Sequence, residues 1–121
     1  MMINMNGVMN IQLVDIDKYQ EFTKTTDIYP KNEFNLGYKA LGLTGEAGEV
    51  ADKIKKFYRG DKPLDEEYKK EIVKELGDVL WYIAAITTEL DINMSEVVMA
   101  NVVKLSERKA NGNIQGNGDN R

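Results

Sequence analysis

The chain has 121 residues, 42% of them apolar, and carries a formal net charge of −4. It has no cysteine and no histidine, so disulfides, thiolate metal sites and imidazole chemistry are excluded, and any chemistry must come from oxygen and amine side chains or an oxygen-held metal. An acidic chain of this size also lacks the concentrated positive charge that binding a nucleic-acid polymer requires.

Two helices are predicted in the first half of the chain. A short one continues through residues 19–26, and either Asp15 or Asp17 is placed to cap its start. A long second helix is expected to begin with Asn32 as its cap and to end near Tyr58.

Two more helices are predicted in the second half, after a turn. The third has Asp65 as its cap, with acidic residues in its first turn, and is expected to reach about Leu90. The fourth has Asn93 or Ser95 as its cap and is expected to end near Lys109.

These helices predict an all-α fold, an antiparallel bundle of about four helices in a single domain over residues 1–110. Residues 111–121 are rich in Gly and Asn and are expected to form a mobile tail. The longest apolar run, 79–86, is too short to cross a bilayer, and residues 1–10 do not resemble a signal peptide. We therefore expect a soluble, cytoplasmic protein without a membrane partner.

The two long predicted helices contain an internal repeat. The segment 46-EAGEVADKIKKF-57 aligns with 75-ELGDVLWYIAAI-86. The matched carboxylates are Glu46 with Glu75 and Glu49 with Asp78. In both copies the acidic pair lies on one flank of the apolar stripe, together with Lys53 in the first copy and Tyr82 in the second. If the helices form a hairpin centred near Lys62, the four carboxylates meet at one height.

Four carboxylates in one half-buried groove repel one another unless a cation resides among them. Ligation by oxygen alone suits a hard ion, so Mg²⁺ is expected, with Mn²⁺ as the alternative. A lone Glu-x-x-Glu pair is usually a solvated helix face. Here the repeat, the shared flank and the matched distance from the turn favour a metal site.

The predicted fourth helix places polar residues on the equivalent flank. These are Asn101, Lys104 and Arg108. Donors aimed at the same groove as a metal would suit a polyphosphate. The alternative is that the basic residues only complement the helix dipole at the end of the helix.

A second apolar face on the third helix predicts self-association. It consists of Trp81, Ala84 and Ala85, while Gly45 and Gly48 on the second helix would let another helix approach closely. We expect a homodimer or homotetramer, most simply a twofold dimer. The alternative is that the short first helix covers this face.

The paired motif Glu46-x-x-Glu49 and Glu75-x-x-Asp78, with 101-NVVKLSERK-109 near the end, resembles the MazG-like family of all-α nucleoside triphosphate pyrophosphohydrolases, from about residue 19 to residue 109. The resemblance implies a Mg²⁺-dependent enzyme that cleaves a nucleoside triphosphate, often a deoxy or non-standard one, to the monophosphate and pyrophosphate. It also implies dimers or tetramers.

The resemblance further implies roles for individual residues. Metal ligands would be Glu46, Glu49, Glu75 and Asp78; phosphate contacts would be Lys53, Asn101, Lys104 and Arg108; Trp81 or Tyr82 would lie near the sugar or base. Many family members carry a glutamate at the position of Gly45, which leaves the number of metal ions open. Arg121 in the tail is expected to fold over the phosphates.

The hypothesis for the mechanism is metal-assisted attack of water on the α-phosphorus, with Glu49 as the base. A relative acting on phosphoribosyl-ATP remains an alternative, as does a non-catalytic helical adaptor whose acidic groove receives a basic partner.

Overall fold

The computed structural model describes residues 2–3, 9–10, 15–29 and 31–119. Its elements in chain order are β1 (Met2–Ile3), β2 (Met9–Asn10), α1 (Ile16–Thr26), α2 (Asn35–Arg59), α3 (Glu66–Glu89) and α4 (Met94–Ala110). The four helices confirm the all-α prediction. The two strands, which form an antiparallel pair of two residues each, were not predicted, because so short a segment shows no alternating pattern.

Three of the predicted helix caps are confirmed. The Asp15 carboxylate accepts from the Asp17 backbone N–H at 2.8 Å, and the Asp65 carboxylate accepts from the Tyr68 N–H at 2.8 Å. Asn93 caps α4, and its backbone N–H donates to the Glu96 carboxylate at 2.6 Å. Each bond satisfies a polar group at a helix end that would otherwise lack a partner.

The prediction that Asn32 caps α2 is wrong. The helix begins at Asn35 after Phe34, and the Asn32 side chain accepts from the Phe34 N–H at 2.8 Å. Asn32 therefore shapes the turn before the helix, as Asn side chains commonly do. At the other end α2 stops at Gly60, whose left-handed φ of 88° suits glycine.

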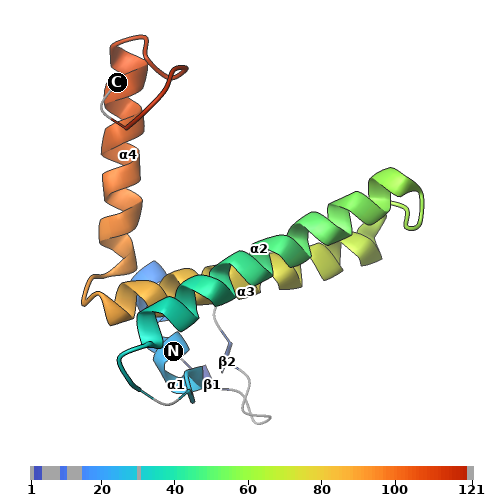
Figure 1. The fold of residues 1–121 in the computed structure, drawn as a ribbon, viewed down its shortest axis with the longest axis horizontal. Coiled ribbons are helices and arrows are strands. Elements are labelled where there is room, and N and C mark those ends of the chain that lie inside the picture. Colours follow the sequence, from blue (N-terminus) through green and yellow to red (C-terminus); the bar gives the residue numbers. More distant parts are fainter. Residues whose placement is uncertain (1, 4–8, 11–14, 30, 120–121) are drawn as a thin grey trace.

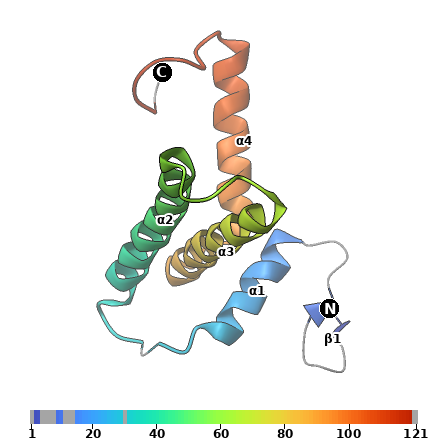
Figure 2. The same cartoon turned by 90° about the vertical axis from the view of Figure 1, so that its right-hand side faces the viewer.

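The helices α2 and α3 form a long antiparallel hairpin, as predicted (Figure 1). Figure 2 looks along this hairpin and shows α3 between α2 and α1. The Trp81 indole N–H donates to the Thr26 hydroxyl of α1 at 2.7 Å, and Ala84 and Ala85 are buried. The short first helix, α1, therefore covers the second apolar face of α3, as the alternative prediction has it. This face gives no support to self-association.

The fourth helix does not lie alongside the hairpin but extends away from it (Figures 1 and 2), so within one chain α4 does not join the hairpin in the predicted antiparallel bundle of about four helices. The first turn of α4 is held by α1: the Met94 N–H donates to the Gln20 side chain at 2.9 Å, and the Ser95 N–H donates to the Asp17 carboxylate at 2.9 Å. These two bonds hold the start of α4 against α1.

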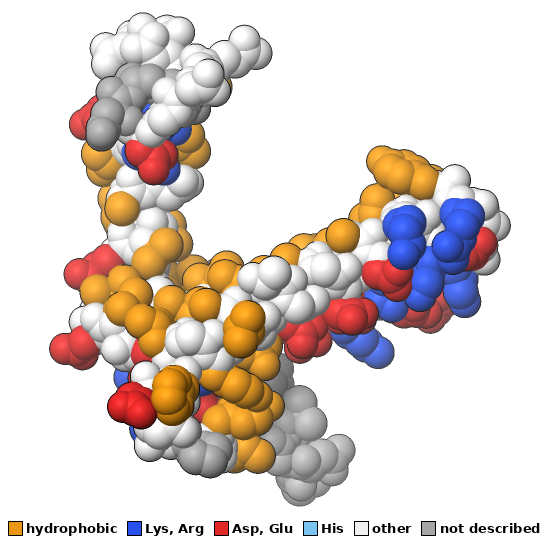
Figure 3. All heavy atoms as spheres, in the orientation of Figure 1, with side chains coloured by type: hydrophobic (Ala, Val, Ile, Leu, Met, Phe, Trp, Pro, Cys, Tyr) orange, Lys and Arg blue, Asp and Glu red, His pale blue; other side chains and the backbone are white. Residues whose placement is uncertain are grey.

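Much apolar surface is exposed in this arrangement. Figure 3 shows hydrophobic side chains along α4 and along the edge of the hairpin that faces it in this view. The apolar residues of α4 that are between 41% and 56% exposed are Val97, Val98, Met99, Val102, Val103 and Leu105. Within the described part of the chain, the buried apolar residues are only Tyr68, Ala84, Ala85 and Met94.

The described part of the tail, residues 111–119, folds back on α4. The Asn113 N–H donates to the Arg108 carbonyl at 2.6 Å, and the Asp119 carboxylate pairs with Lys104 and Arg108, each at 3.3 Å. Arg121 lies outside the described residues. None of the described helices is long and apolar enough to cross a membrane.

Candidate functional site

Three of the four predicted carboxylates converge between α2 and α3. Glu46 of α2 and Glu75 and Asp78 of α3 each offer an oxygen atom, and these atoms all lie within 4.8 Å of one another. We call these three residues the acidic cluster. Glu46 and Glu75 are half-buried and Asp78 is exposed. Glu49, the fourth predicted member, is exposed and lies outside the cluster.

The electrostatics of the acidic cluster are unfavourable for the protein alone. Burial raises the pKa of Glu46, and the negative charges of Asp78, Glu75 and Glu49 raise it further. Each of these charges makes it harder for the Glu46 carboxyl to ionise. A cation among the carboxylates would relieve this repulsion.

The donor set fits a hard divalent cation. All ligand atoms are carboxylate oxygens, the type that Mg²⁺ and Mn²⁺ prefer. Oxygens on opposite sides of an octahedral Mg²⁺ stand roughly 4.2 Å apart, twice the metal–oxygen distance. A spread within 4.8 Å therefore needs only a small contraction of side chains on two rigid helices.

Lys53 lies at the end of the acidic cluster. Its ammonium is 3.4 Å from a Glu71 oxygen and 3.6 Å from a Glu75 oxygen. The Tyr68 hydroxyl donates to the Lys53 carbonyl at 2.6 Å, which ties the two helices together at this point. The predicted basic residue is thus beside the acidic cluster, and its ammonium is paired with one member, Glu75, and with the neighbouring Glu71.

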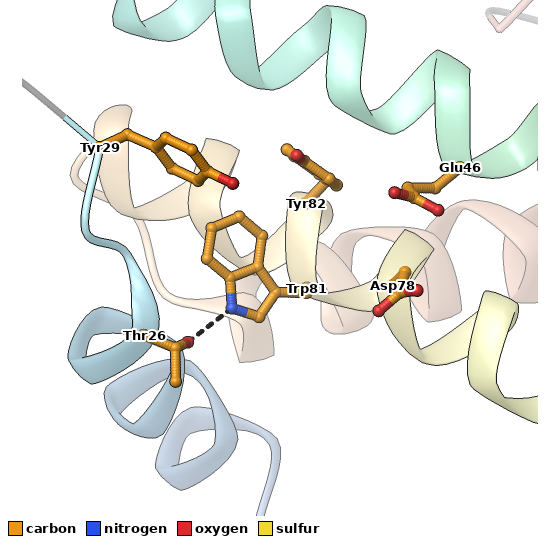
Figure 4. Close-up of a pocket in the computed structure, with 6 residues that line it drawn as sticks. All are labelled: Thr26, Tyr29, Glu46, Asp78, Trp81 and Tyr82. Atoms are coloured by element: carbon orange, nitrogen blue, oxygen red, sulfur yellow. Dashed lines mark hydrogen bonds between the residues drawn. The ribbon is translucent and has the colours of Figure 1, made fainter.

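A pocket of about 280 Å³ adjoins the acidic cluster (Figure 4). Its lining residues are Thr26, Tyr29, Glu46, Asp78, Trp81 and Tyr82. Rings form one end of it, since the Trp81 ring centre lies 5.0 Å from that of Tyr82 and 6.5 Å from that of Tyr29. Carboxylates form the other end. Trp81 and Tyr82, which are predicted to lie near the sugar or base, line one pocket with two members of the acidic cluster.

Tyr29 and Thr26 also line the pocket, but the sequence did not predict them as site residues. Tyr29 lies in the loop between α1 and α2, outside any helical periodicity, and Thr26 is the last residue of α1. In the sequence, the one indication that this loop belongs to a site is an aromatic residue next to Pro30, and that indication is weak.

The predicted phosphate contacts of α4 do not reach the acidic cluster of their own chain. Lys104 and Arg108 bind Asp119, and Arg108 also donates to the Gly118 carbonyl at 3.1 Å. Asn101 lies at a separate, largely apolar hollow between α1, α3 and α4. None of the three lines the pocket beside the acidic cluster.

The fold and this site define a class of protein: an all-α hairpin with a cluster of three carboxylates beside a pocket that has aromatic side chains at its other end. The model of the MazG nucleotide pyrophosphohydrolase domain matches residues 38–112, which include all of α3 and α4 and all but the first turn of α2. The chain belongs to this family.

Two relatives support the assignment. The chain is similar to the Gene 37 protein of Mycobacterium phage L5, with 43% identity over 112 residues that cover 88% of this chain and 98% of the phage protein. It is also similar to the uncharacterized protein YvdC of Bacillus subtilis (strain 168), with 28% identity over 107 residues that cover 81% of this chain and 96% of that protein. No solved structure matches the chain.

Proposed function

We propose that the protein is a Mg²⁺-dependent nucleoside triphosphate pyrophosphohydrolase that cleaves a ribo- or deoxyribonucleoside triphosphate to the monophosphate and pyrophosphate. The observation that carries this proposal is the meeting of the acidic cluster with an aromatic pocket in a chain of the MazG family. The acidic cluster would hold the metal ion that accompanies a triphosphate, and the aromatic pocket would bind the base. A role in cleansing the nucleotide pool would follow from this activity.

The acidic cluster would hold the metal ion, with Mn²⁺ as an alternative to Mg²⁺. When bound, the ion supplies positive charge that offsets the charge of the phosphates. The aromatic end of the pocket would stack against the base or sugar, with Trp81 and Tyr82 as its walls. Lys53 would neutralise a phosphate oxygen from its position beside Glu75.

Glu49 would act as the general base. Its exposure and its place outside the acidic cluster support this role, because a carboxylate engaged with a metal ion is a poor proton acceptor. A water oxygen attacks the α-phosphorus, and the bond from that phosphorus to the bridging oxygen breaks. The bridging electron pair leaves with pyrophosphate, while Glu49 takes the proton from the water.

We also propose that the enzyme is a homo-oligomer, a dimer or a tetramer, and that α4 of one copy serves the site of another. The exposed apolar residues of α4 support this, since burying them against a second copy would be strongly favourable. In such an assembly Asn101, Lys104 and Arg108 would reach the phosphates, and the phosphates would take the place of Asp119.

The roles of Glu49 and Asp78 are tested by purifying the Glu49→Gln and Asp78→Asn variants and assaying pyrophosphate release with Mg²⁺ and with EDTA. Loss of the base or of a metal ligand should lower the rate by about a hundredfold or more. Glu67→Gln is the matched control, because Glu67 is an exposed carboxylate on α3 near its N-terminal end. Rates in both site variants that equal the control rate would refute the proposed roles.

A further inference from the structure

Gly42 of α2 lies directly against the ring of Tyr82 of α3. A β-carbon built on Gly42 would stand 2.1 Å from Cε1, 2.4 Å from Cζ and 2.6 Å from Cδ1 of that ring. Non-bonded carbon atoms prefer a separation of about 3.5–4.0 Å. Even a methyl group at this position would therefore force the ring to move by roughly 1.5 Å.

The other glycines of α2 do not have this contact. A β-carbon at Gly37, Gly45 or Gly48 would meet no atom of the described residues within 4 Å. Glycine lowers helix propensity at all of these positions alike. Within one chain, then, close packing accounts for the glycine at position 42, whereas no described residue packs closely at Gly45 or Gly48.

The Tyr82 ring lies between α2 and the pocket. The backbone of α2 borders it at Gly42, and the Trp81 ring stands 5.0 Å away in an edge-on contact. Tyr82 also lines the pocket that it shares with Tyr29 and the carboxylates, as Figure 4 shows. A push from α2 moves the ring towards that pocket.

We propose that Gly42 is a positioning residue that keeps the aromatic end of the pocket wide, and through this sets the size of the base that the enzyme accepts. This inference rests on the proposed function and deepens it. A side chain at position 42 narrows the aromatic end, so a bicyclic purine is rejected before a monocyclic pyrimidine. With a cavity of only about 280 Å³, a small displacement of one ring changes the fit.

The experiment combines Gly42→Ala with Tyr82→Leu in a double-mutant cycle, with Gly37→Ala as the matched control on the same helix. The first readout is the fluorescence of the ligand-free protein, because Trp81 is the only tryptophan of the chain and lines this pocket. The second is KM and kcat for purine and pyrimidine nucleoside triphosphates.

We expect Gly42→Ala to shift the Trp81 emission and to raise KM for purine substrates about tenfold or more, with a smaller change for pyrimidines and little change in kcat. Gly37→Ala should leave both readouts unchanged. In the Tyr82→Leu background, adding Gly42→Ala should change KM by less than about twofold, because the ring that collides with the new methyl group is gone.

Three results would overturn the inference: equal emission and KM in Gly42→Ala and Gly37→Ala, an undiminished effect of Gly42→Ala in the Tyr82→Leu background, or an equal rise in KM for purines and pyrimidines. If Gly42→Ala does not fold, the Gly42→Ala/Tyr82→Leu protein should fold, and failure of both would also overturn it. If the wild type cleaves no nucleoside triphosphate, the proposed function fails, while the emission of Trp81 still decides the role of Gly42.

Discussion

Lys39 has no exposed surface, although it is a lysine in a helix that is mostly solvent-exposed. Its ammonium pairs with Asp27 at the end of α1 and lies 3.6 Å from a Glu89 oxygen of α3. It also lies 5.9 Å from the centre of the Trp81 ring. One buried cation thus joins three helices near Trp81, a residue of the pocket.

Replacing Lys39 with Met keeps the aliphatic stem but leaves two partly buried carboxylates without their cation. We expect Lys39→Met to lower the free energy of unfolding by about 3–5 kcal/mol, measured by urea denaturation. The control is Lys55→Met, since Lys55 is 63% exposed and pairs with Asp52 at the surface, where such pairs contribute at most about 1 kcal/mol. Equal urea midpoints for the two variants would contradict the structural role of Lys39.

At the scale of the helix, α2 carries a surface ion-pair network one turn beyond Glu49. The Asp52 carboxylate lies 2.9 Å from the Lys55 ammonium and 2.8 Å from that of Lys56. Hydrogen bonds from Lys56 and then Lys55 lower the pKa of Asp52 from 3.8 to about 2. These two ion pairs therefore stabilise the part of α2 that carries Glu49, the proposed base.

Because the pKa of Asp52 is lower in the folded chain than in the unfolded one, its stabilising contribution is complete above pH 3.8 and is lost as the pH falls through about 2. We expect an NMR titration to place the Asp52 carboxyl near that lowered value. The Lys56→Gln variant should move the pKa of Asp52 upwards. A carboxyl that titrates at its ordinary value in the wild type would show that these ion pairs do not form in solution.

In the whole molecule, two features point to an assembly of several copies: the exposed apolar residues of α4 and the separation of Lys104 from the acidic cluster. We expect a molar mass in solution that is a multiple of 13.7 kDa, measured by light scattering. If α4 of one copy completes the site of another, Asp78→Asn and Lys104→Ala should each be inactive alone. The two variants are then dissociated, mixed and allowed to reassemble as dimers. The mixture should regain about a quarter of the wild-type activity, because half of the dimers contain one copy of each variant and each of these dimers has one intact site out of two.

A mixture of two Asp78→Asn preparations, treated in the same way, is the control and should stay inactive. No recovery in the mixture of Asp78→Asn with Lys104→Ala, from proteins that have demonstrably exchanged subunits, would contradict the shared site.

Features that depend on local sequence could be predicted. The caps at Asp15, Asp65 and Asn93 form with residues two or three positions away, so neighbouring sequence decides them. The meeting of Glu46 with Asp78 followed from their equal distance from the turn, because the rise of a helix is constant.

Features that depend on contacts between distant segments could not be predicted. The start of α4 is held by backbone N–H groups that donate to the side chains of Asp17 and Gln20, more than seventy residues earlier in the chain. The burial of Lys39 depends on carboxylates of two other helices, and the need for Gly42 depends on a ring of α3. Helical periodicity describes one helix at a time and carries none of this information.

The central claim, that the acidic cluster and the aromatic pocket together cleave a nucleoside triphosphate between the α- and β-phosphates, is tested most directly by one measurement. A nucleoside triphosphate is incubated with the protein and Mg²⁺ in ¹⁸O-labelled water, and the products are followed by ³¹P NMR, with EDTA and Asp78→Asn as controls. We expect pyrophosphate together with a nucleoside monophosphate that carries the label, and no reaction in either control. Labelled orthophosphate with a nucleoside diphosphate, or the same products in the presence of EDTA, would contradict it.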